Sequence, residues 1–265
     1  MTPEICTILT LVVFLSSNIS AIFGMGGGLI LMGALSIWLP LGQAMLVHGV
    51  IQFLSNAFRG ILSSKDIFYR GTVFYILGSL LALGLWSFLL LTVSKPLMLI
   101  LLGTLAFLPF FPLGKLRPDF LKTPHQILCG FLVTGIQLTA GAAGPVLDIF
   151  FTHTRLSKNQ VIATKSMTQT FGHAVKVLYF GIIFQGSSLG PSDTPALLIL
   201  IAATFLGTWT GKRIGTMVSE QMFRSLTRKM ILALGVLYIC RGVWLQVLNP
   251  EPELLSQTPS QAISD

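Results

Sequence analysis

Two glycine-rich interruptions of long apolar segments constrain the fold of this sequence more than any other feature. The first is Phe23–Gly28, which contains four glycines, and the second is Gly141–Pro145. Glycine weakens a helix and proline breaks it. In a bilayer, broken helices occur where the backbone lines a cavity or a binding site, because lipid cannot satisfy free N–H groups. We therefore expect both interruptions to border one ligand site.

The composition places the apolar segments in a membrane. Of the 265 residues, 53% are hydrophobic and 10% are charged, whereas a soluble domain carries about 25% charged residues. A helix of about 20 residues crosses a bilayer. The sequence therefore predicts an all-α polytopic protein of the cell inner membrane, with eight apolar segments at residues 5–39, 43–62, 71–91, 96–111, 126–151, 160–184, 196–211 and 230–248.

The distribution of Lys and Arg between the loops predicts the topology, because basic loops stay on the cytoplasmic side. If all eight segments cross once, the two sides hold eight and five basic residues. If the first and fifth segments instead enter and return at their glycine breaks, the two sides hold twelve and one. We prefer the second arrangement, which makes six full crossings and places both termini outside.

The preferred topology makes the chain two inverted four-segment repeats, a plan that many secondary transporters use. An internal alignment at an offset of 117 residues supports this duplication. It pairs Gly24 with Gly141, Gly27 with Gly144, Gln43 with Gln160, Gln52 with Gln169, Ala57 with Ala174 and Arg59 with Lys176. The expected organisation is a first membrane repeat (1–111), a cytoplasmic linker (112–125), a second membrane repeat (126–248) and a disordered polar tail (249–265).

Polar residues at helical spacing form one stripe in each repeat. The stripes are His48, Gln52, Asn56 and Arg59 in the first repeat, and Lys165, Gln169, His173 and Lys176 in the second. A charge at mid-membrane costs about 2.5–3.5 kcal/mol on insertion scales, so these side chains should face the protein interior or water. Asp148 is an acid within an apolar segment, and we expect it to form a structural ion pair with Lys165 or Arg155.

Helix N-termini add to this path of basic and amide side chains. If helices restart at Gly26–Gly28 and at Gly144–Pro145, two N-termini with free N–H groups point toward the centre, and such N-termini bind oxyanions. Proline suits a first helical position because no N–H is needed there. The candidate substrate-binding residues are Gly24, Gly26, Gly27, Gly28, Gln52, Asn56, Arg59, Gly141, Gly144, Pro145, Lys165, Gln169, His173 and Lys176.

The glycine motifs also resemble those of the sulfite exporter TauE/SafE family. Gly24–Gly28 is similar to its first signature, G-x-G-G-G, and Gly141–Pro145 to its second, G-x-G-G-P, with Ala143 where glycine is expected. The stretch after the second signature is similar as well, at Ala163, Thr164, Lys165, Gln169, Gly172, His173 and Lys176. The resemblance implies a membrane transporter for sulfite, sulfoacetate or other organosulfur anions. His48 departs from it, because a small hydroxyl residue is expected there.

The expected function is secondary transport of a small anion, either sulfite, an organosulfonate or a related organic anion, by alternating access around a midplane site. Gln52 and Gln169 would orient the anion, basic residues would balance its charge, and His173 would couple transport to protons. An anion channel is the alternative. The sequence carries no enzyme, metal or cofactor motif. Its net charge of +8 lies mostly in loops that set orientation and indicates no nucleic-acid partner. The oligomeric state stays open.

Overall fold

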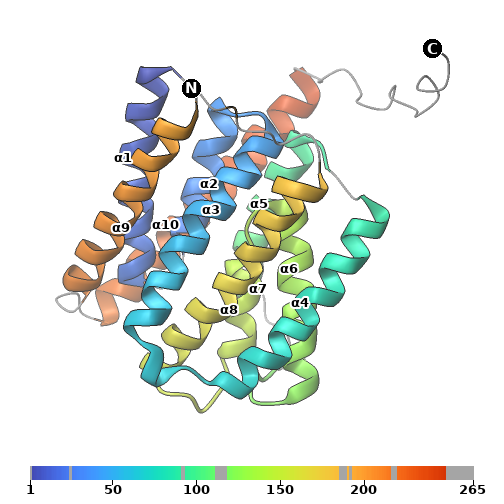
Figure 1. Ribbon diagram of the computed structural model, residues 1–265, viewed down its shortest axis with the longest axis vertical. Helices are drawn as coiled ribbons and strands as arrows, with labels where there is room; N and C mark the ends of the chain where they lie inside the picture. Colours follow the sequence, from blue (N-terminus) through green and yellow to red (C-terminus); the bar gives the residue numbers. More distant parts are fainter. Residues whose placement is uncertain are drawn as a thin grey trace.

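The computed structural model is a bundle of helices (Figure 1). It describes residues 2–23, 26–90, 93–110, 118–184, 190, 193–215 and 220–248, and within them the chain forms ten α-helices and no β-strand. The helices are α1 (Pro3–Phe23), α2 (Gly27–Trp38), α3 (Leu41–Leu62), α4 (Tyr69–Leu89), α5 (Lys95–Phe107), α6 (Thr123–Ala140), α7 (Gly144–Phe151), α8 (Lys158–Leu178), α9 (Thr194–Gly215) and α10 (Glu220–Leu248). The prediction of an all-α polytopic architecture is confirmed.

Both predicted helix breaks are present. The first apolar segment divides into α1 and α2, and the fifth divides into α6 and α7. Gly26, before α2, has a φ of 86°, and Gly141, after α6, has a φ of 83°. These left-handed conformations suit glycine because it has no Cβ. Gly24, also predicted to lie in the first break, is outside the described residues.

Helix lengths differ from the expected crossings in two places. Among the described residues, the helices long and apolar enough to cross a membrane are α1, α3, α4, α9 and α10. The hairpin predicted for the first apolar segment therefore has unequal arms, because α1 has 21 residues and α2 has 12. Conversely, α5 has 13 residues, which gives about 20 Å of helix, although we expected residues 96–111 to cross fully. With 21 residues α8 is long enough, but its polar stripe lowers its hydropathy.

Helices from the two halves of the chain pack in matched pairs. The most extensive contacts join α1 with α9, α4 with α6, α5 with α10, and α3 with α8. Exchanging the first five helices with the last five maps the α1–α9 pair onto α6–α4 and leaves the other two pairs unchanged. Glycine allows the close approach, because a Cβ added at Gly207 would overlap the backbone oxygen of Phe14, and one added at Gly78 would overlap that of Ile127.

The helices run in directions that place the start of α1 and the end of α10 at the same end of the bundle (Figure 1). In Figure 1, α1 begins and α10 ends at the upper end of the bundle, whereas α3 ends and α8 begins at the lower end. The central pair α3 and α8 is antiparallel, because Gly49 lies against Val177 while Gly60 lies against Met167.

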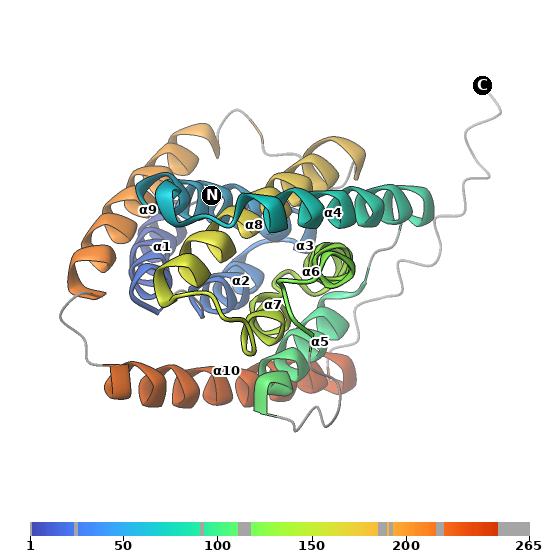
Figure 2. The ribbon, with the colours of Figure 1, turned by 90° about the horizontal axis from the view of Figure 1, so that it is seen from below.

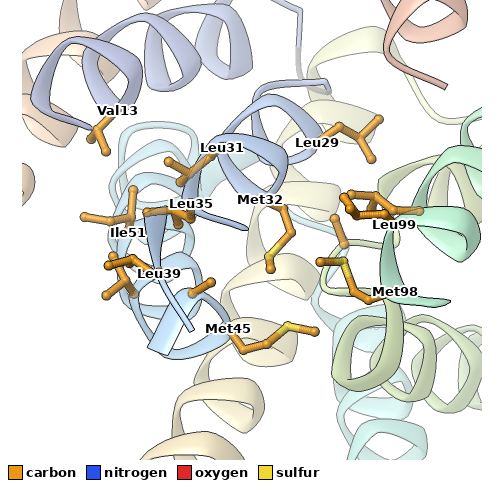
Figure 3. Packing of buried hydrophobic residues seen from close by; sticks show 14 of the residues in the cluster. Val13, Leu29, Leu31, Met32, Leu35, Leu39, Met45, Ile51, Met98 and Leu99 are labelled. Carbon is orange, nitrogen blue, oxygen red and sulfur yellow. The ribbon is translucent and has the colours of Figure 1, made fainter. Parts of the chain in front are cut away.

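The short helix α2 lies in the interior of the bundle, with α10 along one side (Figure 2). It buries Leu31, Met32 and Leu35 completely in the larger apolar core, together with side chains of α1, α3 and α5 (Figure 3). Tyr238 of α10 donates a hydrogen bond of 2.7 Å to the backbone oxygen of Leu29. Its ring occupies the space that a side chain at Gly33 would need. These contacts fix where the N-terminus of α2 lies.

Candidate functional site

A cavity of about 60 Å³ lies where the two broken segments meet α3 and α8. Most of its lining comes from the first turns of α2 and α7 and from the polar stripes of α3 and α8. The lining residues are Ser20, Gly26, Gly28, Leu29, His48, Gln52, Asn56, Arg59, Ala142, Ala143, Gly144, Pro145, Leu147, Asp148, Lys165, Ser166, Gln169, His173 and Ile231.

Most of the sequence-predicted site residues line this cavity. They are Gly26, Gly28, Gln52, Asn56, Arg59, Gly144, Pro145, Lys165, Gln169 and His173. Three others lie beside it without lining it. Gly27 packs against Ser16 and Ser20 of α1, Gly141 packs against Met32, and Lys176 is completely buried behind the wall. Gly24 is not among the described residues.

The two short helices present uncapped N-termini at the cavity. Neither the N-cap of α2, Gly26, nor that of α7, Ala143, supplies a side-chain cap. The first backbone bond of α2 runs from Ile30 N to Gly26 O over 3.1 Å, which leaves the preceding N–H groups without a helical partner. In α7, the N–H groups of residues 146 and 147 both donate to Ala143 O, and Pro145 has no N–H. Both ends therefore carry the partial positive charge that favours an anion.

Two glutamines, one from each polar stripe, bring unused donors to the cavity. The side-chain nitrogens Nε2 of Gln52 and Gln169 are buried and have no hydrogen-bond partner in the described structure. Asn56 fixes the first glutamine, because its Nδ2 donates to the backbone oxygen of Gln52 over 2.8 Å and lies 3.4 Å from its Oε1. A buried donor without a partner is costly unless a ligand or water satisfies it.

The Arg59 guanidinium carries a positive charge into the wall. It is 7% exposed. Its Nη1 donates to the backbone oxygen of Ser20 over 2.6 Å, and its Nη2 donates to Oδ1 of Asn56. No carboxylate pairs with it among the described residues. Because guanidinium stays protonated in proteins, this side chain is a fixed cation held by neutral oxygens.

The second cation, Lys165, is compensated. Its Nζ forms an ion pair with Oδ1 of Asp148, and the two side chains are 13% and 12% exposed. Lys165 and Arg155 were the two partners expected for this acid, and the structure selects Lys165. Both members of the pair line the cavity, so the ion pair belongs to the site.

A chain of hydrogen bonds links the two breaks through His48, which lines the cavity, and the buried Lys176. Nζ of Lys176 donates to the backbone oxygen of Gly141 over 2.8 Å and to Nδ1 of His48 over 3.1 Å. Nε2 of His48 lies 3.0 Å from the backbone oxygen of Gly28. A carbonyl oxygen only accepts, so Nε2 carries the proton and Nδ1 is the acceptor. Lys176, in the second half of the chain, therefore orients the imidazole of His48, in the first half.

The second lining histidine, His173, has different neighbours. The amide nitrogen of Gln137, in α6, lies 2.7 Å from Nδ1 of His173. The rings of His48 and His173 are 5.4 Å apart at their centroids. The two imidazoles therefore sit side by side, one tied to the first break and the other to the helix before the second break.

Sequence reasoning missed several lining residues. Ile231 comes from α10 and carries no signal in an apolar segment. Ser20 lines the cavity and its backbone oxygen accepts from Arg59, a contact that no residue-type pattern predicts. Ser166 lies next to Lys165 in sequence, and its small hydroxyl could have been included with the stripe.

Comparison with known protein families supplies the remaining context. Residues 9–238 match the family described as sulfite exporter TauE/SafE. The searches of curated proteins and of solved structures returned no match. Because the family match spans most of the chain, including both glycine breaks and both polar stripes, the chain belongs to the sulfite exporter TauE/SafE family of membrane transporters.

Proposed function

We propose that this multi-pass membrane protein is a secondary transporter of a small oxyanion, sulfite or an organosulfonate, that binds in the cavity between the two breaks. The observation that carries the proposal is the set of unused donors there. Two uncapped helix N-termini and the unpartnered amide nitrogens of Gln52 and Gln169 surround one cavity beside the Arg59 guanidinium. An oxyanion offers several acceptor oxygens, so it can satisfy these donors together.

The mechanism proposed is alternating access of two inverted repeats, residues 1–111 and 126–248, joined by a cytoplasmic linker at 112–125. Helix bounds support the duplication. Phe23 and Ala140 end α1 and α6, Gly27 and Gly144 begin α2 and α7, and Leu41 and Lys158 begin α3 and α8, each pair 117 residues apart. Two halves of opposite orientation can expose a shared site to either side in turn.

Within this mechanism we assign a separate role to each polar side chain. Gln52 and Gln169 hold the oxygens of the anion, and Arg59 balances its charge. His173 is the proposed point of coupling to protons. The proposed location is the inner membrane, with both termini outside, because that orientation places twelve basic loop residues in the cytoplasm and one outside.

Transport by purified protein in liposomes tests the proposal. We expect saturable uptake of labelled sulfite or sulfoacetate that accelerates when the vesicles are preloaded with unlabelled anion, and a dependence of rate on an imposed proton gradient. Arg59→Met should abolish uptake. Arg70→Met removes an exposed charge in the first turn of α4 and should leave uptake intact. Absence of anion uptake by the wild type would refute the proposal, and His173→Ala protein with wild-type coupling would refute the proton role.

The anion channel is separated from the transporter by the same vesicles. A channel gives conductance that does not saturate and shows no acceleration by preloaded anion. Those results would replace alternating access with a pore.

A further inference from the structure

The ammonium group of Lys176 has a protein acceptor for each of its three hydrogens. Its Nζ lies 2.8 Å from the backbone oxygen of Gly141, 3.1 Å from Nδ1 of His48 and 3.9 Å from the sulfur of Met32. The side chain is completely buried and does not line the cavity. An ammonium has three donors and no acceptor. In the described structure Lys176 therefore has no donor left for a ligand.

Both ring nitrogens of His48 are engaged as well. Nε2–H donates to the backbone oxygen of Gly28 over 3.0 Å, and Nδ1 accepts from Lys176. The residue is completely buried and lines the cavity. The ring cannot turn toward an anion without breaking one of these two bonds. Although it borders the cavity, His48 therefore has no free nitrogen to offer to a ligand.

Together the two side chains join the two helix N-termini that face the cavity. Gly28 lies in the first turn of α2, and Gly141 is the C-cap of α6, three residues before α7 begins at Gly144. His48 belongs to α3 and Lys176 to α8, so the link runs between the two halves of the chain. It fixes the first turn of α2 against the residues that lead into α7.

The internal alignment pairs Lys176 with Arg59, and the two side chains differ in one respect. Each donates to a backbone oxygen at the end of the helix before its own break. The acceptor for Arg59 is Ser20, in the last turn of α1, and the acceptor for Lys176 is Gly141. Arg59, however, lines the cavity, and its Nε has no partner in the described structure. Arg59 thus keeps a donor for an anion, whereas Lys176 does not.

We propose that Lys176 is a positioning residue, which acts through His48 to hold the two helix N-termini at the spacing that the anion needs. The proposal rests on the proposed anion transport and concerns the same site. Donors from two helices bind one anion tightly only when they converge on it, so a small displacement of either helix end lowers the affinity. Loss of the bond between Lys176 and His48 should therefore weaken binding, although neither side chain donates to the anion.

A double-mutant cycle on anion affinity tests this role. The proteins are the wild type, Lys176→Met, His48→Leu and the double variant, and the half-saturating concentration of labelled sulfite is measured in liposomes. Each single substitution should raise this concentration on the order of tenfold, a typical coupling within one hydrogen-bond network. The double variant should be little worse than either single variant, because the link is already broken. If Lys176 acted through its charge alone, the two effects would multiply.

His48→Gln provides a rescue, because its amide carries a donor for Gly28 and an acceptor for Lys176. Its half-saturating concentration should lie closer to that of the wild type than the value for His48→Leu does. Lys65→Met makes the substitution of Lys176→Met at an exposed position in the turn after α3. This control should leave the half-saturating concentration unchanged.

The outcomes separate this proposal from the function on which it rests. Wild-type protein that carries no anion overturns the proposed function, and the positioning role with it. Wild-type protein that carries sulfite, with single effects that multiply in the double variant, overturns the positioning role alone. So does wild-type affinity in Lys176→Met. If that variant fails to insert, the two His48 variants decide, because equal affinities of His48→Gln and His48→Leu contradict the link.

Discussion

Two side chains that line the cavity carry hydrogen-bond donors that the empty protein leaves without a partner. Gln52 is 3% exposed, yet its amide nitrogen, like that of Gln169, has no partner among the described groups. Replacing such a donor by an apolar group of similar size can be neutral or stabilising for the fold. The same replacement removes a hydrogen bond to a charged ligand, so stability and binding should move in opposite directions.

Gln52→Leu and Gln169→Leu should each lower anion affinity on the order of tenfold, the cost of one hydrogen bond to a charged group. Thermal unfolding in detergent without anion should stay at the wild-type temperature or above it. Affinity is measured by competition with labelled sulfite. Gln246→Leu, on an exposed position of α10, is the matched control. Wild-type affinity in both cavity variants would mean that the amides face something other than the anion.

Residue types indicated which side chains line the cavity better than they indicated where the long side chains end. Gln52, Arg59, Lys165 and Gln169 stand out because they are polar in apolar helices, where exposure to lipid is costly. Helical spacing placed Lys176 on the face of α8 that carries His173, and its side chain is completely buried. It could not show that the long side chain turns to Gly141 and His48, because spacing fixes the direction of Cβ and leaves four further bonds undetermined.

The short helices α2 and α7 begin at glycines that play different physical roles. A Cβ added at Gly27 would overlap the backbone oxygen of Ser16, so this glycine allows α1 and α2 to pack closely. At Gly144, nothing lies within 4 Å of an added Cβ. The internal alignment pairs these two residues, yet only the first is needed for packing.

Gly27→Ala should therefore destabilise the protein, by about 1–3 kcal/mol for overpacking, whereas Gly144→Ala should fold normally. Size-exclusion profiles and thermal unfolding in detergent measure the difference. The Gly144 variant places a methyl group at the cavity lining, so reduced anion affinity with normal stability is expected there. Equal stability of the two variants would contradict the assigned packing role of Gly27.

The apolar pattern predicted where the helices lie more reliably than it predicted how long they are. Glycine motifs predicted both breaks to within a few residues because glycine and proline act locally. The end of α5 at Phe107 and the start of α10 at Glu220 were not predicted. At the end of α5, Phe107 packs against Gly235 of α10, and such a contact between residues far apart in sequence leaves no local pattern.

The whole molecule has an orientation that labelling can test. In a variant without native cysteines, single cysteines are placed at Thr2, Ser64 and Asn159, which are exposed and lie before α1, after α3 and at the start of α8. A membrane-impermeant maleimide applied to intact cells should label Thr2→Cys and should reach the other two only after the membrane is opened. Labelling of Ser64→Cys in intact cells would invert the proposed orientation.

Alternating access requires the two halves to move along the α3–α8 contact. A Cβ added at Gly60 would lie 3.5 Å from the terminal methyl group of Met167 and 4.0 Å from the Cα of Met167. Cysteines at these two positions are therefore within reach of a disulfide. In protein carrying Gly60→Cys and Met167→Cys without native cysteines, oxidation should stop sulfite uptake and reduction should restore it. The oxidised single variant Gly60→Cys controls for damage by the oxidant. A pore needs no such movement. Anion flux that survives the crosslink would therefore contradict alternating access, because the two halves would stay joined while anions pass.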